Sequence, residues 1–336
     1  MNIYEILVPY DFGKISIIKI LPIHNIYYKK TTEFSEILFG LFNDDNLIKV
    51  LEEYAKYIIA VVENDNKIVL IDPIDMRQIN NPLLEISQRK IQSITVHPEK
   101  PILAVAMGIY GVMMINYCTG KTLETIKIGV NTVAFNHNGK KMICGTFYPP
   151  KTTVYSISEI NKSYNIEKIK EIFSPISEFV EHVSFSPDDK YIIISDNKKI
   201  NIIDAHNLTI YYVITLDVYC KGISFNRILS AEGYIMVMFV CDYDKVKIYD
   251  LQEFRMIRKV YIPHEIKNTV ILSNGRDMIT STHDNIYINK IAGRNWTGII
   301  NVSNSSFAIN DTETEIIYYD TQHKALVKKD ISMIVN

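Results

Sequence analysis

The stretch that decides the fold runs from Val180 to Asp204 and reads VEHVSFSPDDKYIIISDNKKINIID. An alternating segment ends in a Ser-Pro-Asp-Asp turn, an apolar run and a polar turn follow, and a further apolar segment ends at Asp204. Alternation indicates a half-buried strand, whereas a continuous apolar run indicates a strand buried on both faces. A fourth segment, Thr209 to Leu216, alternates less strictly. The stretch therefore predicts a small sheet whose inner strands are more deeply buried than its last strand.

The same order of segments recurs along the chain. The predicted second strands are apolar runs at Tyr57–Val61, Ile102–Ala106, Met142–Gly145, Tyr191–Ser195, Tyr234–Val240 and Met278–Thr280. In the first unit, Leu47–Leu51 is the predicted strand before this run. Because a strand period recurs at a nearly constant interval, the sequence predicts an all-β ring of small sheets, a β-propeller.

A polar residue that closes the third strand of each unit measures the repeat. These residues are Asp72, Asn116, Asp204, Asp250 and Asp320. They are 44 residues apart from Asp72 to Asn116, 88 from Asn116 to Asp204 and 46 from Asp204 to Asp250, close to the ~40–45 residues of a four-stranded propeller unit. Asp320 follows Asp250 by 70 residues, which predicts that at least one strand there is short or missing.

Three segments carry a resemblance to a known family. Val183-Ser-Phe-Ser-Pro-Asp188, Val112–Tyr117 and Val246–Leu251 resemble the first strand and the third strand of WD-repeat propeller blades. The chain lacks the Gly-His pair that opens such repeats, and its one tryptophan, Trp296, is outside the Trp-Asp position. The resemblance implies a propeller of about seven four-stranded blades, with eight as the alternative. It also implies a non-enzymatic scaffold for protein or peptide partners within a larger complex.

One propeller domain is expected to span residues 1–336. Residues 1–46 fit the repeat less well, and we expect them to supply strands that close the ring or to form a partial extra blade. Residues 159–178, rich in Lys and Glu with scattered Ile and Phe, are interpreted as an irregular insertion between two blades.

The composition restricts the class of partner. The formal net charge of −2 argues against a general nucleic-acid or anionic-membrane binder, which needs a basic excess. Any contact with nucleic acid is therefore expected to be indirect. The longest apolar runs are much shorter than the ~20 residues of a membrane helix, so no membrane span is predicted. With four scattered cysteines and no basic leader at the N-terminus, we expect a cytoplasmic protein.

Motifs that carry chemistry are absent from the sequence. The eight histidines are scattered, and neither a metal-ligand spacing nor a nucleophile elbow nor a phosphate-binding glycine loop occurs. We predict no catalytic residue, metal ligand or cofactor. The recurring Asp72, Asn116, Asp204, Asp250 and Asp320 are interpreted as structural turn residues, because such side chains accept bonds from the backbone two residues further on. The alternative is a propeller enzyme or small-ligand binder, similar to lactonases, with a cation in its central channel.

The loops between second and third strands are the predicted binding surface. In WD-like propellers these loops share one face, and loops on a rigid scaffold are where binding residues concentrate. Three of them carry a tyrosine, Tyr110, Tyr148 or Tyr243, and the last carries His283. Since tyrosine is enriched among residues that dominate interface energies, we predict that these four residues contact a protein or peptide.

Overall fold

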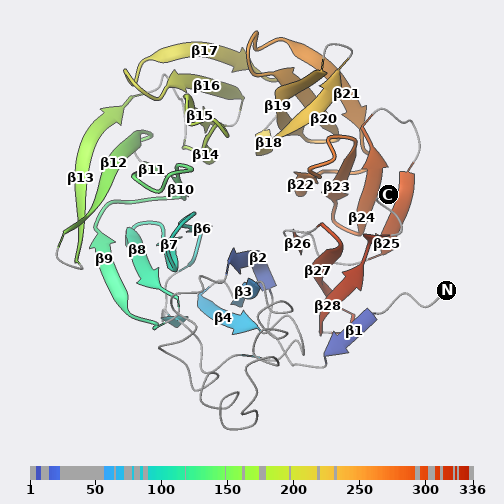
Figure 1. Cartoon of the computed structure of the whole chain (residues 1–336), viewed down its shortest axis with the longest axis horizontal. Helices are drawn as coiled ribbons and strands as arrows, with labels where there is room; N and C mark the ends of the chain where they lie inside the picture. The colour runs from blue at the N-terminus through green and yellow to red at the C-terminus, as the bar shows by residue number, and fades with distance from the viewer. Residues whose placement is uncertain are drawn as a thin grey trace.

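The strands of the computed structural model surround a central axis as a ring of small sheets (Figure 1). The structure describes residues 5–8, 15–22, 57–63, 66–71, 78, 84–85, 90–117, 119–147, 149–160, 163–173, 179–196, 198–217, 220–230, 233–291, 296–301, 307–310, 313–320, 322–323 and 325–332. These residues form seven antiparallel sheets of four strands each. The fold is therefore an all-β propeller.

Six of the sheets consist of four strands that follow one another in the chain, and we call them blades 1 to 6. We name the strands of each sheet A to D from the axis outward. Blade 1 contains β2 (Ile15–Pro22), β3 (Tyr57–Glu63), β4 (Lys67–Ile71) and β5 (Leu84–Glu85); blade 2 contains β6 (Ser93–Val96), β7 (Ile102–Ala106), β8 (Val112–Asn116) and β9 (Thr122–Ile126); blade 3 contains β10 (Thr132–Phe135), β11 (Lys141–Gly145), β12 (Thr152–Ile160) and β13 (Ser163–Ile172).

The second half of the chain repeats this pattern. Blade 4 contains β14 (His182–Phe185), β15 (Tyr191–Ser195), β16 (Lys199–Asp204) and β17 (Ile210–Thr215); blade 5 contains β18 (Cys220–Ser230), β19 (Gly233–Asp242), β20 (Lys245–Asp250) and β21 (Met256–Tyr261); blade 6 contains β22 (Asn268–Ile271), β23 (Asp277–Ser281), β24 (Asn285–Lys290) and β25 (Trp296–Asn301). The remaining strands are β26 (Phe307–Ile309), β27 (Glu315–Asp320), β28 (Ala325–Asp330) and β1 (Glu5–Val8).

The seventh sheet is assembled from both ends of the chain. Its inner three strands are β26, β27 and β28, and its outermost strand is β1, which pairs antiparallel with β28 so that Leu7 faces Val327. The prediction of about seven repeated blades, or of eight, therefore needs correction. Six blades are repeats of four consecutive strands, and the ring is closed by one composite sheet. β1 is the D strand of that sheet and not part of an extra blade.

The first strand of blade 1 differs from the sequence-based expectation. The inner strand is β2, which pairs with β3 in a register that places Ile18 opposite Val61 and Ile20 opposite Ile59. Leu47–Leu51, the predicted strand, lies outside the described residues. Residues 23–56 separate β2 from β3 in the chain, so their pairing leaves no local hairpin signal.

Two further expectations are corrected at the ends of blades. Much of the predicted irregular insertion at 159–178 is β13, the outer strand of blade 3, which pairs with β12 from Thr152 opposite Ile172 to Ile160 opposite Ser163. Asp320 ends β27, the B strand of the composite sheet, rather than a third strand. The predicted missing strand is therefore not missing: blade 6 and the composite sheet are both complete, although β26 has only 3 residues.

The core lies between the faces of neighbouring sheets. One cluster joins Ile143 and Val154 of blade 3 to Val183, Phe185 and Ile192 of blade 4, and equivalent clusters lie at the other junctions from blade 1 through blade 6 to the composite sheet. Strand B of blade 2 is buried at all five positions because it has a blade on each side. A blade alone would expose both apolar faces, so the ring is the stable unit.

The connectivity sorts the loops onto two rims of the ring. In an antiparallel blade, successive strands alternate in direction, so the A–B and C–D turns lie at one rim and the B–C loops lie at the other, together with the connections between blades. We call these the A–B rim and the B–C rim. The predicted binding loops are the B–C loops and so share one rim.

Candidate interaction rim

The B–C loop of blade 2 holds two apolar side chains out of the ring. Ile109 is 80% exposed and Tyr110 is 42% exposed. The loop is narrow: Val130 N–H donates to the Gly108 carbonyl at 2.8 Å, and a Cβ on Gly111 (φ 98°) would lie 2.0 Å from the Ile126 carbonyl oxygen. Because only glycine fits at position 111, the direction in which Ile109 and Tyr110 are presented is fixed by the backbone.

The B–C loop of blade 5 presents Tyr243 in a similar way. Tyr243 is 52% exposed, and its φ of 52° lies in the left-handed region that non-glycine residues seldom adopt. Its carbonyl accepts the Ile266 N–H at 2.6 Å, and the neighbouring Asp244 carbonyl accepts the Ile262 N–H at 2.8 Å. Strained backbone of this kind is concentrated at functional sites and persists only where the surroundings hold it.

The loops of blades 3 and 6 add further groups to this rim. Phe173, directly after β13, is 66% exposed beside the blade 3 loop, where the rings of Phe147 and Phe179 meet with centroids 5.6 Å apart. Tyr148 lies outside the described residues. In blade 6, the His283 ring nitrogen Nδ1 lies 3.0 Å from the Asp284 carboxylate, and both side chains are exposed.

The structure places these residues on one rim but does not bring them together. Blade 2 and blade 5 lie across the ring from each other (Figure 1), so Tyr110 and Tyr243 could contact one partner only if it spanned the mouth of the ring. Two exposed residues of this rim, Ile109 and Phe173, were not among those predicted. The Gly108-Ile-Tyr-Gly111 sequence was a usable signal for the first, whereas Phe173 followed a strand that sequence reasoning had not identified.

Three lysines of the B–C rim are paired with carboxylates. Lys151 contacts Glu171 at 2.9 Å, Lys267 contacts Glu265 at 3.0 Å, and Lys245 contacts Asp244 at 3.3 Å. Exposed pairs of this kind contribute little to stability. Within the described part of the chain, no three His, Cys, Asp or Glu side chains are grouped so that they could hold a metal ion. The rim therefore offers exposed apolar and aromatic side chains, and the three lysines named above are already paired with carboxylates.

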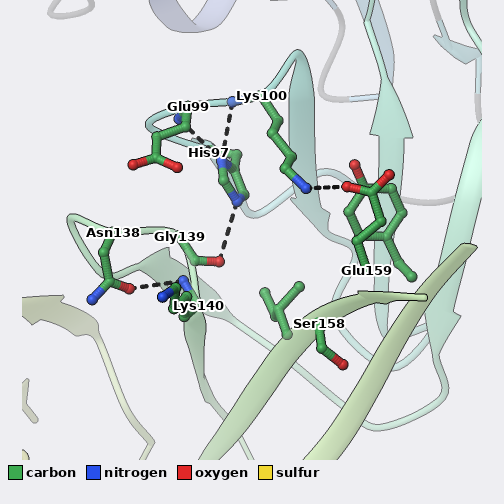
Figure 2. A pocket seen from close by; sticks show the side chains of 10 residues that line it. His97, Glu99, Lys100, Asn138, Gly139, Lys140, Ser158 and Glu159 are labelled. Carbon is green, nitrogen blue, oxygen red and sulfur yellow. Dashed lines mark hydrogen bonds and ion pairs between the residues drawn. The ribbon is translucent and has the colours of Figure 1, made fainter. Parts of the chain in front are cut away.

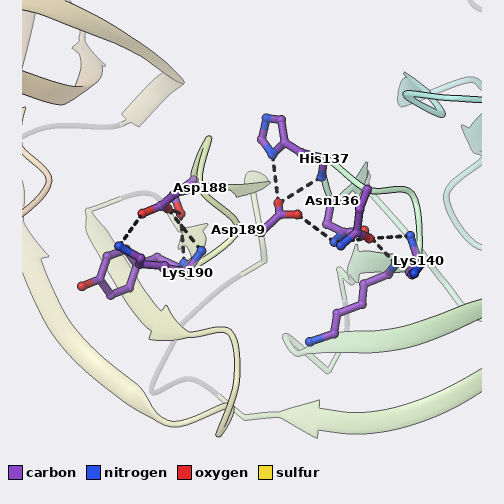
Figure 3. Close-up of polar contacts among 10 residues, drawn as sticks. Asn136, His137, Lys140, Asp188, Asp189 and Lys190 are labelled. Atoms are coloured by element: carbon purple, nitrogen blue, oxygen red, sulfur yellow. Dashed lines mark hydrogen bonds and ion pairs between the residues drawn. The ribbon is translucent and has the colours of Figure 1, made fainter.

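The A–B rim is built for contacts between blades. Asp189, in the A–B turn of blade 4 with a φ of 56°, accepts hydrogen bonds from blade 3: from Asn136 Nδ2 at 2.9 Å and from the His137 N–H at 3.0 Å (Figure 3). His137 Nδ1 also lies 2.9 Å from this carboxylate. Glu313 of the composite sheet binds Ser273 of blade 6 in the same manner. These acidic turn residues join neighbouring blades.

His97 joins blade 2 to blade 3 at the same rim. Its Nδ1 accepts the N–H groups of Glu99 at 3.1 Å and Lys100 at 3.2 Å, and its Nε2 lies 3.1 Å from the Gly139 carbonyl oxygen (Figure 2). With Nδ1 accepting, the neutral ring carries its proton on Nε2 and donates it to Gly139. The histidine thus caps its own turn and bonds the next blade.

A cavity of about 350 Å³ opens beside this histidine (Figure 2). Lys100 bridges it, because its ammonium pairs with Glu159 and lies 5.1 Å from the centroid of the Tyr164 ring. Since the carboxylate of Glu159 already neutralises Lys100, the cavity does not present an uncompensated charge there.

The predicted turn residues accept backbone bonds where they are described. Asp204 Oδ1 accepts the His206 and Asn207 N–H groups, Asp250 Oδ1 accepts those of Gln252 and Glu253, and Asp320 Oδ1 accepts those of Gln322 and His323. Asn116 Oδ1 accepts the Thr119 N–H at 3.0 Å. Asp72 lies outside the described residues. The first two aspartates and Asn116 end C strands, whereas Asp320 ends a B strand, and in the composite sheet Asp330 occupies the C-strand end.

We expect the variant Asp204→Asn to reduce the acid sensitivity of the fold. The two backbone N–H bonds hold the pKa of Asp204 below its ordinary value. The ionised Asp204 carboxylate therefore stabilises the fold fully above the pKa of about 3.9 of an unfolded aspartate. This stabilisation is lost as the pH falls through the lowered pKa of the folded state. An asparagine oxygen accepts the same bonds at every pH. Melting temperatures measured between about pH 6 and pH 2.5 should fall less steeply for the variant, and parallel curves would contradict this role.

The described cysteines are poorly suited to nucleophilic chemistry. Cys144, Cys220 and Cys241 are buried, and none of these three is in a disulfide. Burial raises the pKa of the Cys144 thiol and raises the pKa of Cys220 to about 12. Because the thiolate is the reactive form, neither of these two sulfur atoms is available as a nucleophile or metal ligand near neutral pH.

Comparison with known proteins identifies the fold and nothing narrower. No protein-family model and no curated protein sequence matches the chain. Among solved structures, 1491 chains are similar. One is a chain in the structure described as "Crystal Structure of Mitotic Checkpoint Complex", with a TM-score of 0.67 and 11% identity over 82% of this chain and 84% of that one. At this identity the similarity shows a shared propeller architecture. No helix among the described residues is long and apolar enough to span a membrane.

Proposed function

We propose that this protein is a non-enzymatic, WD-like interaction scaffold whose B–C rim binds a protein partner across the mouth of the ring. The observation that carries the proposal is the way in which Ile109, Tyr110 and Tyr243 are held. The tight turn at Gly111, which has no room for a Cβ, and the left-handed backbone at Tyr243 keep these side chains exposed. Apolar and aromatic side chains that remain exposed on rigid loops are typical of protein interfaces.

Two further features support a protein partner. Lys151, Lys245 and Lys267 of the rim are each paired with a carboxylate, and the formal net charge of the chain is −2, so the chain lacks the overall basic excess that general phosphate recognition requires. The similar solved chain was determined within an assembly described as a mitotic checkpoint complex.

We expect the double variant Tyr110→Ala and Tyr243→Ala to weaken partner binding by about 2 kcal/mol or more with little effect on folding. Both side chains are largely exposed, so their removal leaves no buried cavity. Affinity purification from the native source, with partners identified by mass spectrometry and quantified, measures the effect.

A matched control is Tyr164→Ala, which removes a tyrosine from the opposite rim, where it lines the cavity beside His97. Partners retained by the wild type and by this control but lost by the double variant would support the B–C rim. Equal recovery by all three proteins, with unchanged melting temperatures, would show that the proposed surface is wrong.

A further inference from the structure

The outer strand of blade 4, β17, lacks the protection that other outer strands of the ring have. Its sequence, Ile210-Tyr-Tyr-Val-Ile-Thr215, contains no charged residue, whereas β9 contains Glu124 and β21 contains Arg258 and Lys259. Among the described outer strands only β25 is also uncharged, and it has Gly298 near its middle. Proteins usually protect an edge strand with charges, because its free backbone groups can pair with another chain.

The backbone of β17 is available for pairing on its outer side. Leu216 N–H donates to the Lys198 carbonyl at 2.8 Å, and Ile214 faces Ile200 in the same register. Since hydrogen-bonded pairs alternate along an antiparallel ladder, the N–H and C=O groups of Val213 and Thr215 point away from β16. The equivalent residue of blade 2, Thr125, shows this direction: its N–H donates to the exposed Glu124 side chain and not to β8.

The side chains of β17 form one end of an apolar surface that continues onto blade 5. The rings of Tyr211 and Tyr212 lie 5.6 and 5.5 Å from the ring of Phe254, which is buried and has a φ of 53°. Next to it, Met256 and Ile257 are exposed on β21. The aromatic contacts fix the two tyrosines in place, so this part of the surface is already ordered.

The other end of β17 is basic. Thr215 faces Lys199, and on blade 5 Lys247 faces Lys259. The Lys247 side chain is 5% exposed, yet its ammonium contacts the carboxylate of the exposed Asp217 at 3.2 Å. The hydrogen bond and charge of Lys247, together with Lys259 and Lys245, lower the pKa of Asp217. This end of the strand therefore already holds one carboxylate, which indicates the charge of a complementary ligand.

We propose that an extended segment of another protein adds to β17 as a fifth, antiparallel strand, with acidic residues at its N-terminal end and apolar residues after them. Its backbone would bond Val213 and Thr215, its acidic end would lie near Lys199 and Lys259, and its apolar side chains would cover Tyr211 and Tyr212. Strand addition of this kind draws affinity from main-chain bonds and specificity from alternate side chains. This surface is on the outer side of the ring; its basic end lies beside the B–C rim, but it includes neither Tyr110 nor Tyr243.

The test uses the purified full chain and a fluorescein-labelled peptide, Glu-Glu-Val-Thr-Val-Tyr-Val-Thr, with binding followed by fluorescence anisotropy. We expect Val213→Pro to weaken binding about tenfold or more, because proline removes the outward N–H and its ring blocks the edge. The hydrogen bonds between β17 and β16 are kept, because the N–H of residue 213 does not take part in them. The matched control Thr125→Pro makes the same change on blade 2 and should bind as the wild type does. Val213→Lys provides a second edge-blocking variant if the proline variant unfolds.

Charge is tested by a second peptide in which Lys-Lys replaces Glu-Glu. The wild type should prefer the acidic peptide, and Lys259→Glu should reduce or reverse that preference. Three outcomes would overturn the proposal: no binding of the acidic peptide to the wild type, wild-type affinity in both folded edge variants (Val213→Pro and Val213→Lys), or equal affinity of the wild type for the two peptides. Because the Tyr110→Ala and Tyr243→Ala changes lie on the B–C rim, they should leave peptide affinity unchanged, so the two proposals can fail separately.

Discussion

Replacing Phe185 with alanine is expected to lower the free energy of unfolding by about 3–5 kcal/mol. Phe185 lies on strand A of blade 4, is 4% exposed, and packs in the cluster between blades 3 and 4 with Ile143, Val183 and Ile192. Its removal leaves a cavity that strands on both sides cannot fill, because they are held by their own ladders. Urea unfolding of the wild type and the variant measures the loss as a shift of the midpoint at an unchanged m value, the slope of unfolding free energy against urea concentration.

The control for this variant is Phe173→Ala. The same ring is removed, but Phe173 is 66% exposed at the B–C rim, so the expected change is within about 0.5 kcal/mol. Similar losses for the two variants would mean that Phe185 does not lie in a packed layer between blades.

The variant Gly139→Ala is expected to cost about 3 kcal/mol. Gly139 has a φ of 67°, which is unfavourable for alanine by roughly 1–2 kcal/mol. In addition, the new Cβ would lie 2.1 Å from Cε1 of the buried His97 ring. Moving that ring disrupts its hydrogen bond to Gly139 of blade 3 and its two hydrogen bonds within the blade 2 turn, each worth about 1 kcal/mol. Thermal or urea unfolding of the variant gives the total.

Gly120→Ala separates the two contributions. Gly120 has the same φ of 67° but is exposed after β8, so this variant carries mainly the conformational cost. The double variant His97→Ala with Gly139→Ala should be less destabilised than the sum of the single changes, because the clash is then absent. Equal losses at Gly139 and Gly120, or simple additivity, would contradict the contact.

The inner strands of blades 2 to 5 could be predicted because burial on both faces imposes a distinct sequence. Ile102–Ala106 and Tyr191–Ser195 are apolar runs bounded by turns, and both are B strands. The outer strand β13 carries no such signature. One side of it faces water, so Lys and Glu residues interrupt its apolar ones, and the segment resembles an insertion.

Measuring the repeat by the polar residue that closes each third strand gave a wrong result where two similar residues end different strands. Asp320 and Asp330 both end a strand of the composite sheet, but only Asp330 ends a C strand. The interval from Asp250 to Asp330 is 80 residues, two regular repeats of ~40. Measured to Asp320, it is too short and falsely indicates a missing strand.

The candidate binding residues were only partly predictable. Placement of Tyr110 and Tyr243 on a shared rim follows from strand order, which the repeat reveals. Their separation across the ring does not follow from the local sequence. Contacts between blades, such as His137 with Asp189, join residues 52 positions apart. The turns involved have different residues in each blade, so no common motif marks them.

The pairing of β1 with β28 sets the order in which a newly made chain can finish folding. Leu7 is synthesised before its neighbour Val327, which lies 320 positions later in the chain. Until then the growing chain has two open ends that can bind the unfinished ends of other molecules. The cost of joining such distant segments grows only with the logarithm of their separation. A nascent chain that stalls before Ala325 therefore lacks the pairing of β1 with β28 that closes the ring, and its open sheet edges stay exposed.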